Sequence, residues 1–458
     1  MFSVKDLSFS YTSYDGKEGK KVLDNLSFSL SDKEAILILG ESASGKSTLS
    51  LILSALAPAF FDGKLTGELL LDGKALPAAP KLTGQISLVP QDCSQFIITS
   101  QVEDEIVYPL ESLGVKKEEM ATRLEIAIKE WGLEKLRKAG TGELSGGEKR
   151  RLVLAASLIT DPSIVIYDEA FDDLDHSWRE KLATLIKSRR HASIVFASHY
   201  LPFFDNLFDK ILILKDGTLK EGSSSSFKAN LNFKRVESVK KRDDKLEAKN
   251  ILFTHRRKIA DDDLSFTLNA KDFYLKSGEI VTLTGANGSG KSTFSRLLCG
   301  LDNVQSGSFY LNGKETDSII LRRSVAYMFQ NPDYQIFLPT VEDELSFSLD
   351  YLRLSKKEKD ERVDHLCSLF SLNKSDIASL MSFGDRKRLQ AAIYYNLDRP
   401  FIILDELDSA LNYSEAFRVV SLLAERCAGI LLITHDRDFA SAVKTRGYKI
   451  EEGLLYAE

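Results

Sequence analysis

The stretch Gly285-Ala-Asn-Gly-Ser-Gly-Lys-Ser-Thr293 follows the apolar run 279–284 and precedes the amphipathic run 294–300. This order predicts a strand, a phosphate-binding loop and a helix. Glycine lets the loop fold around an anion, so that successive N–H groups and the helix N-terminus face a phosphate. Lys291 adds a positive charge and Ser292 a hydroxyl ligand for magnesium. The stretch therefore predicts a nucleoside triphosphate site.

A second loop of the same kind, Gly40-Glu-Ser-Ala-Ser-Gly-Lys-Ser-Thr48, follows the apolar run 35–39. A glutamine after a short strand, an Asp-Glu pair ending an apolar run, and a histidine also recur, as Gln91 and Gln330, Asp168-Glu169 and Asp405-Glu406, and His199 and His435. The spacing falls from 245 residues between the loops at 40 and 285 to 236 between the histidines. A few deletions in the second half explain this drift, so the chain is predicted to be an internal duplication.

The residues expected to contact nucleotide in the two loops are Gly40, Glu41, Ser42, Ala43, Ser44, Gly45, Lys46, Ser47 and Thr48, and Gly285, Ala286, Asn287, Gly288, Ser289, Gly290, Lys291, Ser292 and Thr293.

Composition places the chain among ordinary globular proteins. The length of 458 residues and the repeat favour two units of about 220 residues, each large enough for its own core. A net charge of −6 provides none of the overall positive charge expected of a nucleic-acid-binding protein. No secretory signal and no apolar run near the ~20 residues of a membrane span is visible, so a cytosolic chain is expected. Scattered cysteines without metal-site spacing are expected to pack in the core: Cys93, Cys299, Cys367 and Cys427.

Residues 2–30 alternate apolar and polar positions, which predicts half-buried antiparallel strands ahead of the first loop. Tyr11 is placed in the turn between these strands, where it could stack on a nucleotide base. The alternative is a tyrosine that packs locally at a strand end. His255 takes the same position in the second copy and would be a poorer stacking platform.

The stretch Leu144-Ser-Gly-Gly-Glu-Lys-Arg-Arg-Leu152 predicts a further anion site at a helix N-terminus. Ser145, Gly146 and Gly147 would form it. The alternative is an ordinary Ser-capped helix, but the serine lies 23 residues before Asp168, which favours binding.

Residues 223–249 are polar and charged, and they are predicted to link a first domain at 1–222 to a second at 250–458. A nucleic-acid-binding arm is the alternative. Acidic residues interrupt the basic ones there, which favours the linker.

The order of phosphate loop, glutamine, LSGGE, Asp-Glu and histidine resembles that of ATP-binding-cassette (ABC) ATPases, twice over nearly the whole chain. The resemblance implies an α/β fold: two P-loop ATPase domains, each with a mostly parallel sheet core, an antiparallel β part and an inserted helical part, near 91–152 and 330–389. It implies ATP and Mg²⁺ as ligands. The metal would be held by Ser47, Gln91 and Asp168 in one copy and by Ser292, Gln330 and Asp405 in the other. Glu169 and Glu406 would polarise the attacking water, and His199 and His435 would contact the γ-phosphate.

Family members usually pair head to tail, so a duplicated chain could form both composite sites within itself. Site one would combine Lys46, Gln91, Glu169 and His199 with the helix that begins near Ser382 and Gly384. Site two would combine Lys291, Gln330, Glu406 and His435 with Ser145, Gly146 and Gly147. The second copy departs from the family pattern at Phe383, which replaces a glycine, and at Asn412, which stands where Asp175 stood.

The segment Asn331-Pro-Asp-Tyr-Gln335 looks like that of energy-coupling factor (ECF) transporter ATPases, which drive uptake of vitamins and of cobalt or nickel ions. The first copy keeps only Asp92 and Gln95 of it. The resemblance implies a peripheral protein on the cytoplasmic face of the membrane. Its partners would be an ECF-type transmembrane coupling subunit and a substrate-binding subunit, with no nucleic acid. The acidic residues Asp92, Asp333, Glu342 and Asp343 would help to dock a basic helix of the membrane subunit.

Two other classes of ABC protein are compatible with a chain lacking membrane spans. Tandem ABC proteins that act on ribosomes are similar but have a long basic helical linker, whereas residues 223–249 are short and mixed in charge. DNA-repair and chromosome ABC ATPases would need a coiled-coil or zinc insertion, and neither is visible.

Overall fold

The computed structural model describes residues 1–12, 18–41, 44–77, 79–198, 204–223, 243–259, 262–409, 411–426, 429–434 and 436–458. They divide into two compact units, the first containing residues 1–223, 258–259 and 262, and the second containing residues 243–257 and 263–458. Within the described ranges, no helix has both the length and the apolar character needed to cross a membrane. Cys93, Cys299 and Cys367 are buried free thiols, as expected, and Cys427 lies outside the described residues.

The core of the first unit is a sheet of order β10-β9-β3-β8-β7-β6. Every neighbouring pair is parallel except β9 with β10. The central strands are buried along their whole length, as apolar runs covered on both faces should be. The strand bounds are β3 (Ala35–Leu39), β6 (Ile86–Val89), β7 (Ile164–Asp168), β8 (Ala192–Ala197), β9 (Lys210–Lys215) and β10 (Thr218–Glu221).

A second sheet of the first unit, β2-β1-β4-β5, is antiparallel and confirms the pattern read over residues 2–30. Its strands are β1 (Phe2–Thr12), β2 (Glu18–Leu30), β4 (Gly63–Leu71) and β5 (Lys74–Ala75). Tyr11 lies inside β1, opposite Gly63 of β4. The prediction that Tyr11 occupies a turn is therefore wrong, because the ladder with β4 continues to the end of the strand.

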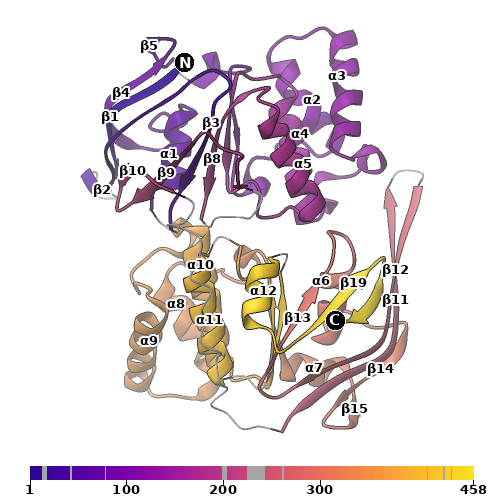
Figure 1. Ribbon diagram of the computed structural model, residues 1–458. Helices are drawn as coiled ribbons and strands as arrows, with labels where there is room; N and C mark the ends of the chain where they lie inside the picture. The colour runs from indigo at the N-terminus through magenta and orange to yellow at the C-terminus, as the bar shows by residue number, and fades with distance from the viewer. Residues whose placement is uncertain are drawn as a thin grey trace. The chain divides into compact units, whose positions relative to one another are not determined.

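Helices α2 to α5 gather on one side of the first unit and the antiparallel strands lie on the other, where α1 is also drawn (Figure 1). The helix that follows β3 is α1 (Lys46–Leu53). The inserted helical part predicted at 91–152 is present. The remaining helices are α2 (Val102–Ser112), α3 (Lys117–Glu130), α4 (Gly146–Leu158) and α5 (His176–Lys187).

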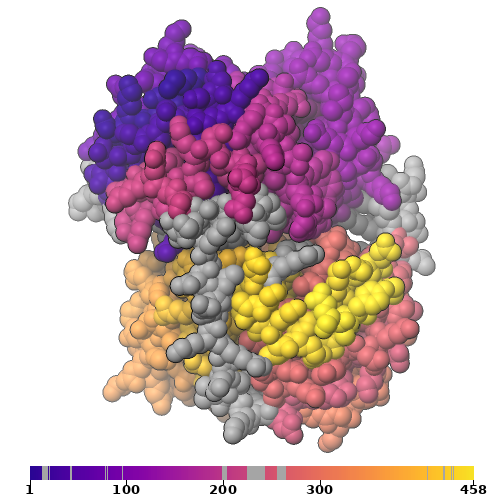
Figure 2. Space-filling model, in the orientation of Figure 1, coloured from indigo at the N-terminus to yellow at the C-terminus, as the bar shows by residue number. Residues whose placement is uncertain are grey.

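The second unit repeats this plan in one continuous sheet of order β15-β14-β11-β12-β20-β19-β13-β18-β17-β16. Its strands are β11 (Lys245–Ile259), β12 (Asp262–Lys276), β13 (Glu279–Thr284), β14 (Ser306–Leu311), β15 (Lys314–Thr316), β16 (Val325–Met328), β17 (Phe401–Asp405), β18 (Gly429–Ile433), β19 (Arg446–Glu451) and β20 (Leu454–Ala457). The last two form a hairpin on the surface of this unit, yellow in Figure 2. Residues 245–249 belong to β11, because the consecutive residues 246–249 pair there with β14. The linker predicted over 223–249 therefore ends too late.

The helices of the second unit are α6 (Lys291–Leu298), α7 (Ser318–Ser324), α8 (Val341–Ser348), α9 (Lys356–Phe370), α10 (Phe383–Leu397), α11 (Tyr413–Arg426) and α12 (Arg437–Val443). Helices α8, α9 and α10 form the inserted helical part predicted at 330–389. Both units are thus α/β, with a parallel core sheet, an antiparallel part and an inserted helical part.

Candidate active site

Each phosphate loop connects a central parallel strand to a helix, β3 to α1 and β13 to α6. Gly45 and Gly290 stand directly before these helices with φ of 102° and 108°. A Cβ atom on Gly45 would lie 2.8 Å from the Leu23 side chain, and one on Gly290 would lie 2.5 Å from the Phe266 ring. Both positions therefore need glycine for its backbone conformation and for space.

The loop lysines are buried and bound in the same way in both units. Lys46 Nζ donates to the carbonyl oxygens of Gly40 (2.8 Å) and Glu41 (3.0 Å). Lys291 Nζ donates to those of Gly285 (2.9 Å) and Ala286 (3.0 Å). Each ammonium group is thus positioned inside the loop by backbone atoms.

The other predicted loop residues are placed as follows. Ser47, Thr48, Ser292 and Thr293 lie in the first turns of α1 and α6, and Ser42 and Ala43 lie outside the described residues. The hydroxyls of Ser44 and Ser289 are buried and make no hydrogen bond within the described part of the chain. Asn287 and Gly288 lie in the second loop, where Gly288 has a φ of 76°.

Asp168 ends β7 and is buried beside the first loop. Its Oδ2 accepts a hydrogen bond of 2.8 Å from Ser50 Oγ. Its Oδ1 is buried without a geometrically satisfied partner in the described residues. Burial raises the pKa of Asp168, and the hydroxyls of Ser50 and Ser47 partly oppose this shift.

These residues fit a magnesium ion, because an unpartnered carboxylate oxygen beside a serine hydroxyl is the hard oxygen donor that Mg²⁺ prefers. Ser47 and Asp168 would hold the ion. The described residues contain no cluster of three or more His, Cys, Asp or Glu side chains that could hold a metal. Nucleotide phosphates and water would therefore complete the coordination, and the ion would offset phosphate charge.

The second unit arranges its aspartate differently. Asp405 ends β17, and its Oδ2 accepts a hydrogen bond from the hydroxyl of Tyr327 in β16. Burial, with the neighbouring Glu406 charge, raises the pKa of Asp405 to about 6. Ser295, which corresponds to Ser50 by the offset of the loops, is buried with a hydroxyl that no described residue satisfies. Tyrosine thus replaces serine as the aspartate's partner.

The predicted catalytic glutamates follow the aspartates in both units, with left-handed φ of 50° at Glu169 and 49° at Glu406. Glu169 Oε1 lies 3.3 Å from Lys46 Nζ, and its Oε2 accepts a hydrogen bond of 3.0 Å from Ser198 N. Burial raises the pKa of Glu169 to about 8, against the opposing charge of Lys46.

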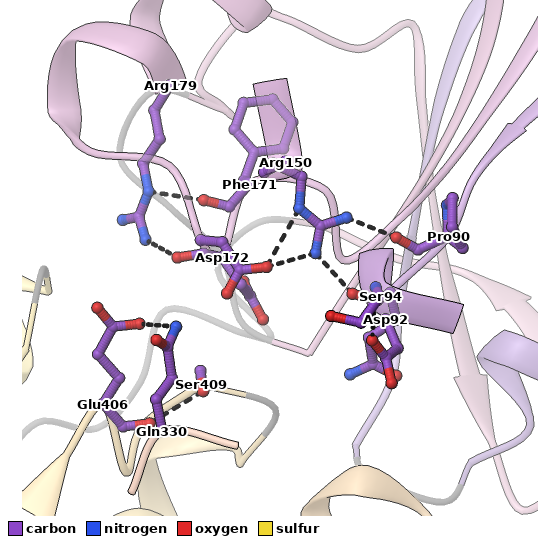
Figure 3. A network of polar contacts seen from close by, with 12 residues as sticks. Pro90, Asp92, Ser94, Arg150, Phe171, Asp172, Arg179, Gln330, Glu406 and Ser409 are labelled. Carbon is purple, nitrogen blue, oxygen red and sulfur yellow. Dashed lines mark hydrogen bonds and ion pairs between the residues drawn. The ribbon is translucent and has the colours of Figure 1, made fainter. Parts of the chain in front are cut away.

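Glu406 instead accepts a hydrogen bond of 2.7 Å from Gln330 Nε2, as Figure 3 shows. The structure thus brings together a glutamine and a glutamate that the sequence placed 76 residues apart. The predicted histidines, His199 and His435, lie outside the described residues.

Each of the two predicted anion-binding helices is preceded by a serine that acts as its N-cap. Ser145 and Glu148 form a capping box at the start of α4, where Gly146 and Gly147 are the first residues. Ser382 caps α10 by accepting a hydrogen bond of 3.1 Å from Asp385 N. Phe383 is the first residue of α10, and its ring centroid lies 5.8 Å from the Arg386 guanidinium and 5.5 Å from Lys387 Nζ.

The structure shows two sets of contacts that were not predicted from the sequence. Tyr11 bonds through its hydroxyl to Thr48 Oγ1 of α1 at 3.1 Å, and its ring meets Phe9 edge to face. Arg150 and Lys387 contact the loops that follow the acidic pairs. Their signal was present in the sequence, because both are basic residues at one position of the repeat, five residues after Ser145 and Ser382.

The model of the ABC transporter family matches residues 23–172 and 268–409, which contain both phosphate loops, both glutamines and both Asp-Glu pairs. This chain belongs to the ABC transporter family. It carries two fused ABC ATPase domains and is an ATP-binding, ATP-hydrolysing protein, as the order of its motifs predicted.

Relatives match this ABC protein from end to end. A Treponema denticola protein, provisionally named ABC transporter ATP-binding protein, is 27% identical over 99% of this chain and 96% of its own. A Methanosarcina mazei protein with the same provisional name is 28% identical over 99% of this chain and 94% of its own. Among solved structures, a model of ribosome-bound archaeal Pelota and ABCE1 covers 98% of this chain and 78% of its own, with a TM-score of 0.68 and 18% identity. That likeness shows the fold alone.

Proposed function

We propose that this chain powers a membrane transporter, as the ATPase subunit of an ECF-type importer of a vitamin or a transition-metal ion. It would act at the cytoplasmic face of the membrane with a transmembrane coupling subunit and a substrate-binding subunit. Support comes from relatives that match nearly the whole chain and carry transporter names. The ECF-like segment after Gln330 supports the narrower class.

In each half, Lys46 and Lys291 would bind the triphosphate, and Ser47, Asp168, Ser292 and Asp405 would hold the magnesium ion. Gln91 and Gln330 would join the metal shell to the partner surface. Glu169 and Glu406 would orient the attacking water and take its proton. Burial raises the pKa of Glu169 and so favours its protonated form, whereas the neighbouring Lys46 favours the carboxylate that a general base requires. His199 and His435 would contact the γ-phosphate.

Completion of each site by the other half of the chain remains part of the proposal. Ser382 and Gly384 would complete the first site, and Ser145, Gly146 and Gly147 would complete the second. Each serine hydroxyl accepts a hydrogen bond from the N–H group of the third residue of its helix. The N–H groups of the first two residues would then be the donors for an anion.

The ECF-like segment has a structural part and an exposed part. Gln335 accepts a hydrogen bond of 3.0 Å from Phe329 N and donates one of 2.9 Å to the Tyr327 carbonyl oxygen, so it fixes the loop after β16. Asp333 lies 3.3 Å from Arg386 Nη1. Asp343 caps α8 with Thr340, whereas Glu342 is exposed. Of the acidic residues assigned to docking, Glu342 is therefore the one whose substitution should disturb the fold least.

The first unit has an apolar cavity of about 390 Å³ beside its glutamine loop. Pro90, Phe96, Ile98 and Tyr108 are among its lining residues, and Ile98 is 69% exposed. Asp92 in this loop caps a short turn by accepting a hydrogen bond of 2.9 Å from Ser94 N. A coupling helix that docks here would insert an apolar side chain, in addition to the acidic contacts expected from sequence.

Purification from detergent-solubilised membranes tests the proposal. We expect the full-length chain to copurify with stoichiometric integral membrane subunits, and Glu342→Lys to lose them while it still binds ATP. Glu452→Lys is the matched control, because it reverses a charge in the exposed β19–β20 hairpin (Figure 2) and should keep the complex. Copurification with ribosomes or nucleic acid in place of membrane subunits would favour the rival class and overturn the proposal.

A further inference from the structure

Arg150 lies in α4, five residues after the serine that caps the helix, and its side chain is almost completely buried at 1% exposure. The guanidinium faces two loops. Nη1 donates to the Pro90 carbonyl oxygen at 2.5 Å and Nη2 to that of Gln91 at 2.6 Å. Figure 3 shows the contact with Pro90. These carbonyls belong to the residues with which the glutamine loop begins, directly after β6.

The same guanidinium reaches the loop that follows Glu169. Nε and Nη2 both donate to Asp173 Oδ2, at 3.2 and 2.6 Å. Arg179 of α5 holds the backbone of this loop from the other side, donating to the carbonyl oxygens of Phe171 (2.8 Å) and Asp172 (3.0 Å) (Figure 3). The loop is therefore braced on both sides, and Arg150 is its connection to the glutamine loop.

The second unit distributes these contacts over two side chains. Lys387, at the position of Arg150, donates to the Glu406 carbonyl oxygen and to Ser409 Oγ, both in or beside the loop after the acidic pair. Gln390, one turn later, donates to the Phe329 carbonyl oxygen at 3.2 Å, the position of Pro90. Val153 stands at the position of Gln390 in the first unit. One residue thus contacts both loops in the first unit, and two residues share these contacts in the second.

We propose that Arg150 is a positioning residue that makes the Gln91 loop and the loop after Glu169 move as one body in the first unit. A planar guanidinium with donors on several edges can hold two carbonyls and a carboxylate at once. A shift of the glutamine loop on nucleotide binding is then transmitted to Glu169 through a single rigid group. In the second unit, Lys387 and Gln390 divide these contacts between them, and the glutamine loop is joined to Glu406 through the side chain of Gln330.

The test is the residual ATP hydrolysis of the first site, measured in the purified full-length chain that carries Glu406→Gln, with and without Arg150→Lys. The Asp173→Ala and Arg151→Lys variants are made in the same Glu406→Gln background. Lysine keeps the charge but has a single donor group, so it cannot span both loops. We expect kcat to fall between about 10-fold and 100-fold, as for a catalytic group moved by about an ångström. KM should stay within about twofold, because the phosphate loop is untouched. Asp173→Ala removes the far contact alone and should lower kcat in the same direction with unchanged KM.

Arg151→Lys is the matched control. Arg151 is the next residue of α4 and donates to the carbonyl oxygens of Trp131 (2.9 Å) and Gly132 (2.8 Å), and it contacts neither loop in these bonds. We expect kcat to change less than about twofold in this variant. An unchanged kcat in Arg150→Lys, an equal fall in Arg151→Lys, or a rise in KM that accounts for the loss would overturn the proposal. If Arg150→Lys does not fold, a normal kcat in Asp173→Ala would do the same.

Discussion

At the scale of single residues, the phosphate-loop lysines give the most direct test of the nucleotide sites. Lys46→Ala and Lys291→Ala each remove a cation that backbone carbonyls hold inside the loop. A charge-assisted hydrogen bond contributes about 1.5–3 kcal/mol, so we expect ATP to bind at least about 10-fold more weakly at the altered site. Equilibrium binding of labelled ATP measures this.

Lys5→Ala serves as the control for these variants, because Lys5 is an exposed lysine of β1 whose nearest carboxylate, on Glu68, is 4.0 Å away. Its affinity for ATP should match that of the unaltered chain. Unchanged affinity and stoichiometry in both loop variants would contradict the site assignment.

Tyr11 separates two modes of contact with the first loop. If its ring stacks on the base, Tyr11→Phe should bind ATP normally and Tyr11→Ala should lose about 1–3 kcal/mol of binding free energy. The hydrogen bond to Thr48 predicts instead that phenylalanine and alanine weaken binding alike. We expect the stacking pattern, and calorimetric titration with ATP distinguishes the two. Equal losses would assign Tyr11 to the support of α1.

Residue types at the motifs could be predicted from sequence, whereas their partners could not. Lysine, aspartate and glutamate recur at fixed places because phosphate and metal chemistry requires them. The Tyr327 hydroxyl on Asp405 depends on how β16 packs against β17, which no local pattern records. The contact of Arg150 with Asp173 likewise joins residues 23 positions apart across two elements.

At the scale of elements, the substitution of Asp175 by Asn412 finds an explanation in helix capping. Asp175 Oδ1 accepts a hydrogen bond of 3.1 Å from Trp178 N, and Asn412 Oδ1 accepts one of 2.9 Å from Glu415 N. Both residues precede a helix, α5 and α11. The change from acid to amide therefore keeps the cap, since asparagine and aspartate cap about equally well.

Replacing either capping residue by alanine should therefore destabilise the start of its helix, whereas exchanging asparagine for aspartate should not. We expect Asp175→Ala and Asn412→Ala each to lower the free energy of unfolding by about 1 kcal/mol, and Asn412→Asp to change it by less than about half of that. Urea denaturation of the full chain, followed by intrinsic fluorescence, measures the differences. A loss in Asn412→Asp as large as in Asn412→Ala would show that the amide does more than cap.

Elements themselves were largely predictable from their pattern. The apolar runs before both phosphate loops and both Asp-Glu pairs became the buried parallel strands β3, β7, β13 and β17. Boundaries were less accurate. Tyr11 continues β1 and residues 245–249 begin β11, because pairing with β4 and β14 extends strands beyond what their composition indicates.

At the scale of the whole molecule, we expect the two ATP sites to differ in rate. Phe383 replaces the glycine that would approach the γ-phosphate of the first site, and its side chain adds bulk where close approach is needed. Glu406→Gln should then lower steady-state ATPase activity by about 10²- to 10⁴-fold, as loss of a general base does. Glu169→Gln should cost distinctly less. Both variants are measured as the purified full-length chain.

The contacts of Phe383 sharpen this expectation. Its ring lies over Arg386 and Lys387, one turn along its own helix, so the obstruction is smaller than a freely projecting benzyl group would cause. We therefore expect a slower first site with residual turnover. Equal losses in the two glutamine variants, or a greater loss in Glu169→Gln, would show that the ring is accommodated without effect.

The duplication and the α/β plan of each half were the most predictable features, since the same motifs recur in the same order. What distinguishes the halves was visible only as isolated substitutions. Lys387 for Arg150 and Tyr327 for Leu88 gain meaning through their neighbours, Ser409 and Asp405. These substitutions change the geometry of one copy of the site relative to the other. Such differences in geometry cannot be predicted from one sequence alone.

The left-handed backbone conformation at Glu169 and Glu406 limits which residue types can occupy these positions, whatever their role in hydrolysis. Side chains other than glycine, and β-branched ones above all, are disfavoured in that conformation, whereas asparagine enters it readily. In a saturation library sorted for folded yield alone, valine, isoleucine and threonine would be depleted at both sites and glycine and asparagine would be tolerated. A library sorted for ATP hydrolysis would retain glutamate. Comparing the residues enriched in the two libraries at each position distinguishes those that the backbone conformation accepts from those that ATP hydrolysis requires.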